Sequence, residues 1–168
     1  MNWDTFHRLP DDARVWISGF ERPLDPVEQE MVRAGMERFA AGWASHQVPV
    51  ESAFEIVQDR FLVIAACTPG SVSGCSIDSM MRNMRDLYSA VGVAPPAGNL
   101  IYFRDETGRI QSIDHLEFRD VADSGRLKPD TRVFDTLIQN LGQLRAGRFE
   151  LPYQEAWHAR AFPLPVTA

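Results

Sequence analysis

The sequence predicts an α+β fold, in which a ferredoxin-like βαββαβ sandwich is followed by a small α/β extension packed on it. Two observations lead to this class. In the first hundred residues or so, β-prone segments and segments of helical periodicity follow one another as strand, helix, strand, strand, helix and strand. After a Pro-Pro-Ala-Gly break at 95–98, a further strand pair and a short helix begin a second unit.

The first strand and the first helix are indicated by local composition. Residues 14–20 (RVWISGF) are β-prone, and Asp25 followed by Pro26 is typical of an N-cap and a first helical residue. Apolar residues then recur at spacings of three and four as far as Trp43. We therefore expect an amphipathic helix that ends near His46.

Two strands and a second helix follow. Residues 52–58 and 60–67 predict an antiparallel hairpin that turns near Asp59. The second strand is apolar at successive positions, so both its faces must be covered. A loop then leads to a second helix, which ends at Gly92. Its apolar face consists of Ile77, Met80, Met81, Met84, Leu87, Tyr88 and Val91.

The chain divides into two parts at the proline-rich break. We assign residues 1–97 to the ferredoxin-like core, with its last strand supplied by 99–104, and residues 98–168 to the extension. In the extension, 100–103 and 110–113 predict a second hairpin. A helix over 114–123 and a short strand over 131–134 are expected after it.

The tail carries three large aromatic residues, Tyr153, Trp157 and Phe162. So many aromatic side chains are unusual in a solvated tail, because large apolar groups are stabilised by burial. We therefore expect them to dock on the sheet face that the helices leave uncovered.

The composition argues against several classes of function. The 168 residues carry a formal net charge of −6, which repels a phosphate backbone, so no nucleic-acid partner is expected. The longest apolar run, 61–67, is far shorter than the roughly 20 residues of a membrane span, and the N-terminus lacks the apolar core of a signal peptide. Two cysteines are too few for a disulfide scaffold. We expect a cytoplasmic protein without membrane insertion.

Several short phrases of the sequence resemble a known family. They are 13–17 (ARVWI), 43–46 (WASH), 54–65 (FEIVQDRFLVIA), 74–78 (GCSID), 131–134 (TRVF) and 156–160 (AWHAR). Along nearly its whole length, the chain is similar to a family of small uncharacterised bacterial proteins that often carry the automatic label "ABC transporter ATPase". The resemblance implies no established activity.

The ATPase label conflicts with the residues present. A P-loop needs the pattern G-x-x-x-x-G-K-[ST], in which a lysine reaches the β- and γ-phosphates. The only lysine is Lys128, which Pro129 follows and no glycine-rich loop of that form precedes. The sequence therefore argues against a P-loop ATPase.

A second resemblance covers 101–157. A hairpin (IYFRDETGRI) and a helix are followed by G-x-L-x-P-x-T-x-V-F at 125–134 and by a later tryptophan. This layout is similar to bacterial GYF-like modules, which are small domains that bind partner peptides. The Gly-Tyr-Phe motif itself is missing, so the resemblance lies in the layout.

Cys75 is the strongest candidate for chemistry. If the second helix begins near Ser76, the Cys75 thiol stands at its N-terminal edge, where free amides and the helix dipole favour a thiolate. The carboxylate of Asp78 works against this effect. In the structural alternative, Gly74 permits a tight turn, Ser76 caps the helix and Asp78 offsets the helix dipole.

Two histidines and a second cysteine are further candidates. His46 is expected in the last turn of the first helix, where it can act as a base or simply bind the C-terminal carbonyl groups. His158, beside Trp157, either pairs with Cys75 or His46 as a base or metal ligand or is the half-buried polar tip of a docking segment. Cys67 ends a strand and either pairs with Cys75 or packs as a small apolar residue.

Two functions remain open at this point. The first is a binding or structural protein that acts through a surface, with another protein or a second copy of itself (a homodimer) as partner. The second is a thiol-dependent enzyme or redox protein, with Cys75 as nucleophile, His46 or His158 as base, and Asp78 or Ser76 as orienting group. The usual metal, hydrolase and dinucleotide motifs are absent, so we predict no cofactor and no metal site.

Overall fold

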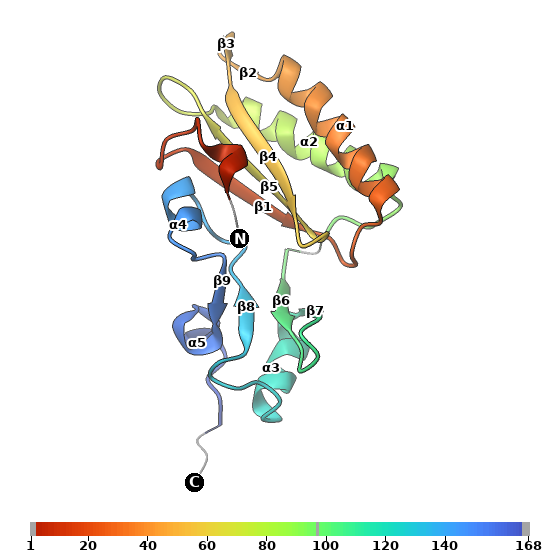
Figure 1. Cartoon of the computed structure of the whole chain (residues 1–168), viewed down its shortest axis with the longest axis vertical. Helices are drawn as coiled ribbons and strands as arrows, with labels where there is room; N and C mark the ends of the chain where they lie inside the picture. The colour runs from red at the N-terminus through yellow and green to blue at the C-terminus, as the bar shows by residue number, and fades with distance from the viewer. Residues whose placement is uncertain (1–2, 97, 166–168) are drawn as a thin grey trace. The chain divides into compact units, whose positions relative to one another are not determined.

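The protein folds into two compact units with mixed helices and antiparallel sheets, which confirms the α+β class (Figure 1). The computed structural model describes residues 3–96 and 98–165. Unit 1 contains Met1–Pro95 and Leu137–Ala146, and unit 2 contains Pro96–Thr136 and Gly147–Ala168. Where the sequence suggested a single division at Gly98, the chain also returns to unit 1 through 137–146.

Unit 1 is built on a three-stranded antiparallel sheet. Its order is β1 (Arg14–Gly19), β5 (Phe61–Cys67) and β4 (Glu51–Val57). The structure confirms the predicted β4–β5 hairpin, which turns at Gln58 and Asp59, both with positive φ. The polar side chains of these two residues suit such a turn, because Asn, Asp and their relatives tolerate it better than branched residues do.

Two long helices, α1 (Pro26–Gly42) and α2 (Gly74–Ala90), pack with one face of this sheet in a common apolar core. As predicted, Asp25 caps α1 and Pro26 opens it, and Glu28 completes a capping box. The helices approach closely where α1 has a glycine, since a β-carbon at Gly35 would collide with Leu87 of α2. The core between sheet and helices includes Met36, Leu62, Ile64, Met80 and Met84.

The opposite face of the sheet is covered by two short elements of unit 1. The short helix η1 (Asp4–Phe6) lies against β4, where the hydroxyl of Thr5 donates to the carboxylate of Glu55. The helix α4 (Leu141–Arg145) adds the buried Leu141 and Leu144. The side chain of Arg145 joins α4 to the N-terminal segment by donating to the carbonyl oxygens of Phe6 and Leu9, at 2.9 and 3.0 Å.

The structure corrects the predicted position of the last strand of the βαββαβ order, which belongs to the sheet of unit 2. The strand β6 (Leu100–Arg104) pairs on one side with β7 (Ile110–Asp114) and on the other with β8 (Arg132–Phe134). Both of its edges are therefore used within unit 2, and it cannot extend the sheet of unit 1. The returning segment 137–146 binds the edge of β1 instead. The N–H of Val15 donates to the carbonyl of Gln139 at 2.9 Å, and the N–H of Leu141 donates to the carbonyl of Ala13 at 3.0 Å.

The predicted end of the first helix was also wrong. Helix α1 ends at Gly42, and the chain continues into a small hairpin of β2 (Ala44–Ser45) and β3 (Val48–Pro49). His46 and Gln47 form its turn with φ values of 52° and 66°. The sequence prediction missed this hairpin because its strands have only two residues each.

Unit 2 contains a four-stranded sheet of order β7-β6-β8-β9, with β9 at Glu150–Pro152. The predicted second hairpin, the helix α3 (His115–Asp123) and the strand β8 are all present. Among the described residues, no helix is long and apolar enough to cross a lipid bilayer.

The tail aromatics belong to the core of unit 2, which corrects their predicted place on the first sheet. Tyr153 starts the short helix η2 (Tyr153–Glu155), and α5 (His158–Ala161) precedes Phe162. Tyr153 and Phe162 pack with Phe118 of α3, with ring centroids 6.2 and 5.3 Å from that of Phe118. The tail thus packs on the apolar face of α3 within its own unit, while α4 and η1 cover the first sheet.

Candidate functional site

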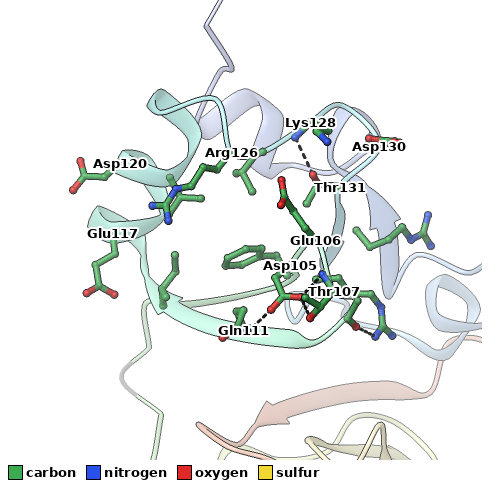
Figure 2. Close-up of a pocket in the computed structure, with 17 residues that line it drawn as sticks. Asp105, Glu106, Thr107, Gln111, Glu117, Asp120, Arg126, Lys128, Asp130 and Thr131 are labelled. Atoms are coloured by element: carbon green, nitrogen blue, oxygen red, sulfur yellow. Dashed lines mark hydrogen bonds between the residues drawn. The ribbon is translucent and has the colours of Figure 1, made fainter.

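The main cavity that we consider is an open pocket of about 1320 Å³ within unit 2 (Figure 2). It lies between the β6–β7 turn, helix α3 and the loop that leads into β8. Its apolar part is formed by Phe103, Ile113, Val121 and Leu127, and charged side chains surround that part. Apolar surface beside polar groups is typical of binding sites for small molecules and peptide segments.

The β6–β7 turn forms a well-ordered wall of the pocket. The carboxylate of Asp105 accepts hydrogen bonds from the hydroxyl and backbone N–H of Thr107, at 2.6 and 2.8 Å, and from the amide of Gln111, at 2.6 Å. These side-chain hydrogen bonds from Thr107 and Gln111 lower the pKa of Asp105 to about 2. The turn thus carries a negative charge that is held, among the described residues, by neutral donors.

The opposite wall is the loop 125–131. The backbone N–H of Lys128 donates to the hydroxyl of Thr131 at 2.8 Å, and the N–H of Thr131 donates to the carbonyl of Lys128 at 3.0 Å. Figure 2 shows the side chain of Glu106 reaching from the β6–β7 turn toward this loop. Glu106 therefore presents a carboxylate inside the pocket.

Two of the lining arginines are already bound to a carboxylate. Arg104 donates to both oxygens of Glu150, at 2.7 and 3.2 Å, and Arg132 donates to the backbone oxygen of Glu150 at 2.6 Å. Burial alone would raise the pKa of Glu150, but the bonds from Arg104 and the charges of both arginines outweigh burial and lower it. This cluster holds β6, β8 and β9 together.

Other charges of the pocket have no such partner. Within the described part of the chain, no ion pair is formed by Glu106, Glu117, Asp120, Arg126, Lys128 or Asp130. All six side chains are exposed. They are therefore available to the charged groups of a bound molecule.

The structure places Cys75 in the first turn of α2 rather than before it, because the helix starts at Gly74, two residues earlier than predicted. Its side chain is exposed. No hydrogen bond or ion pair to Cys75 occurs among the described residues. In the described part of unit 1, neither His46 nor Asp78 is bonded to the thiol.

Ser76 has a structural role, which differs from the predicted cap. The N-cap is Ser73, whose hydroxyl accepts from the backbone N–H of Ser76 at 3.3 Å. The buried hydroxyl of Ser76 donates to the carbonyl of Ala44 at 2.7 Å, and Trp43 Nε1 donates to the carbonyl of Ser76 at 3.1 Å. These bonds join α2 to the end of α1 and to β2.

The remaining candidates lie on separate elements. Asp78 is exposed on α2, and His46 is exposed in the β2–β3 turn. His158 belongs to unit 2, where it is 1% exposed and stacks on Trp157 with ring centroids 4.0 Å apart. Burial lowers the pKa of His158 to about 4, and its Nδ1 has no hydrogen-bond partner in the described structure.

Cys67 is half-buried at the end of β5, and both cysteines are free thiols. Burial, together with the nearby carboxylates of Glu51 and Asp12, raises the pKa of the Cys67 thiol. We expect Cys75 to be alkylated faster than Cys67, because its thiol is exposed and thiolates are the reactive species. Alkylation of Cys67→Ser and Cys75→Ser variants, followed by mass spectrometry at neutral pH, measures each thiol alone. Equal rates, or slower alkylation of Cys75, would contradict the structure.

Sequence reasoning missed the pocket and Ser73. Many of the pocket charges lie in two short loops: 105–108 has two acidic residues and was interpreted only as a turn, and 126–130 has two basic residues and one acidic residue and was interpreted only as part of the GYF-like layout. A search for charged loops that flank one hairpin and one helix would have found them. No group of three or more His, Cys, Asp or Glu side chains in residues 3–96 and 98–165 is placed to hold a metal ion.

Comparison with known proteins gives no relative from which a function could be carried over. The chain matches no protein-family model, no curated protein and no solved structure.

Proposed function

We propose that this protein is a binding protein, and that the pocket of unit 2 holds a segment of a partner protein. The observation that carries the proposal is the pocket itself, with an apolar part of Phe103, Ile113, Val121 and Leu127 and a rim of exposed charges that form no ion pair within residues 3–96 and 98–165. Such a surface fits a peptide, because apolar side chains can fill the centre while backbone and charged groups meet the rim.

Other expectations are consistent with this proposal. The layout likeness of 101–157 to GYF-like peptide-binding modules covers the hairpin, helix and loop that surround the pocket.

In unit 1, the order β1-β5-β4 with two helices on one face is what three strands of a ferredoxin-like sandwich would give, and we propose that relationship for it. Free thiols at Cys67 and Cys75 agree with a cytoplasmic location.

The proposal is tested by blocking the pocket. Glu106→Trp puts a large ring into the pocket at an exposed position that makes no ion pair in the described structure, so folding should be unaffected. We expect the wild type to retain a set of peptides from a random peptide array, and the variant to bind them at least about tenfold more weakly. Binding constants of the retained peptides, measured by calorimetry, give the ratio.

Glu155→Trp is the matched control. Glu155 is exposed in the same unit, on η2, and does not line the pocket. Its substitution should leave peptide binding unchanged. If Glu106→Trp binds the same peptides as tightly as the wild type does, the pocket is not the binding site and the proposal is wrong.

A further inference from the structure

We infer that the segment bound by this pocket is basic, with lysine or arginine side chains on either side of an apolar anchor. This inference rests on the proposed function and adds the chemical class of the partner. It is argued from the charges of the pocket and from the groups that already neutralise some of them.

The pocket has an excess of negative charge, which is larger than the lining residues alone would give. Five carboxylates line it, those of Asp105, Glu106, Glu117, Asp120 and Asp130. Four cations line it as well, but Arg104 and Arg132 both bind Glu150. With Glu150 included, the carboxylates exceed the cations by two formal charges.

The acidic groups also stand where a guest would meet them. Asp105 stays ionised because neutral donors hold it, and no cation of the described chain offsets its charge. Glu106 extends between the two walls (Figure 2). Glu117 and Asp120 are exposed on α3 along another side of the pocket. A guest with cationic side chains thus meets the carboxylates of Asp105 and Glu106 at one wall, and those of Glu117 and Asp120, which point outward from α3 in Figure 2, at the rim.

Arg126 and Lys128 are the groups that would favour an acidic guest instead. Arg126 lies in the loop that follows α3, and its Nε donates to the hydroxyl of Ser124 at 3.1 Å. Lys128 lies in the same loop, toward which the side chain of Glu106 reaches (Figure 2). These two cations stand against the five carboxylates that line the pocket. An acidic segment would meet Glu106 at the centre, and like charges in an interface cost binding energy.

The charge preference is tested with two defined probes. One is a fluorescein-labelled peptide in which leucines alternate with lysines, and the other has glutamate in place of every lysine. Fluorescence anisotropy at low and high salt measures their binding to the wild type. We expect the lysine peptide to bind more tightly, and its affinity to fall as salt rises, since screening weakens charge attraction.

Two charge reversals locate the effect. Glu106→Lys should lower the affinity for the lysine peptide at least about tenfold and raise the affinity for the glutamate peptide. Glu155→Lys should change either affinity by less than about twofold. Both variants alter the net charge equally and within the same unit. If Glu155→Lys weakens the lysine peptide as much as Glu106→Lys does, the attraction is a general effect of an acidic protein, and the inference is wrong.

The outcome also separates this inference from the proposed function. If Glu106→Trp blocks array peptides but the lysine peptide binds no better than the glutamate peptide, the pocket binds peptides of another class and only the charge preference is overturned. If Glu106→Trp blocks no peptide, the proposed function fails together with the inference.

Discussion

A chain that ends at residue 96 is expected not to fold stably, although it contains every strand of the first sheet and both long helices. It lacks Leu137–Ala146, which belongs to unit 1. Leu141 and Leu144 of this segment are fully buried. Losing one buried leucine side chain costs about 2–5 kcal/mol, and a whole domain is stable by only about 5–15 kcal/mol. Two such losses therefore consume most of the stability of unit 1.

The edge of β1 would also be exposed. In the intact protein, Val15 donates to Gln139 O and Ala13 accepts from Leu141 N, so truncation leaves backbone groups of the strand without these partners. Thermal unfolding by circular dichroism should show no cooperative transition for the fragment, or one at a much lower temperature.

The control restores the missing segment. Fusing 137–146 to the end of the fragment through a flexible linker should recover cooperative unfolding, whereas the same fusion with Leu141 and Leu144 replaced by serine should not. A fragment that melts as cooperatively and at the same temperature as the full chain would show that the returning segment is dispensable.

The elements that were predicted correctly depend on residues that are close together in the sequence. Asp25 and Pro26 begin a helix because the cap and the first turn depend on neighbouring residues only. The β4–β5 hairpin is equally local, since its strands are joined by a turn at Gln58 and Asp59. Such elements are determined within about ten residues of sequence, which is the range in which periodicity and turn residues are informative.

Pairing between segments that lie far apart in the sequence could not be predicted from such local patterns. The strand β6 fits the predicted ferredoxin-like order by position, but its partners β7 and β8 use both of its edges. Nothing in the sequence of 137–146 indicates that it pairs with β1 instead. The pocket shares this difficulty, because loops 105–108 and 126–131 meet only after the sheet of unit 2 has formed. The surroundings of His158 were equally inaccessible, since its imidazole contacts Trp157 and Phe118 only after the tail has packed on α3.

Unit 2 is expected to lose stability as the pH falls from 6.5 toward 4, because of His158. Its imidazole is 1% exposed, lies against Trp157 and Phe118, and has a pKa lowered by burial from 6.5 to about 4. Above pH 6.5 the histidine is neutral in both the folded and the unfolded chain, so its titration does not affect the equilibrium. Between the two pKa values the unfolded chain binds a proton that the folded chain excludes, which favours unfolding.

The size of this effect follows from the difference between the two pKa values. Each pKa unit corresponds to about 1.4 kcal/mol, so the free energy of unfolding should fall by about 3 kcal/mol across this window. Below pH 4 both states are protonated at this site and the loss should level off. Urea unfolding monitored by circular dichroism at a series of pH values measures the slope.

The variant His158→Phe separates this site from all other titrating groups. Phenylalanine fits an aromatic cluster and has no proton to bind, and it removes a buried Nδ1 that lacks a hydrogen-bond partner among the described residues. The carboxylates and the other histidines are the same in both proteins, so their titration cancels in the difference between the two unfolding free energies. That difference should grow in favour of the variant as the pH falls from 6.5 to 4. A difference that stays constant over this range would mean that the His158 imidazole is protonated as readily in the folded protein as in the unfolded chain, and that water reaches it.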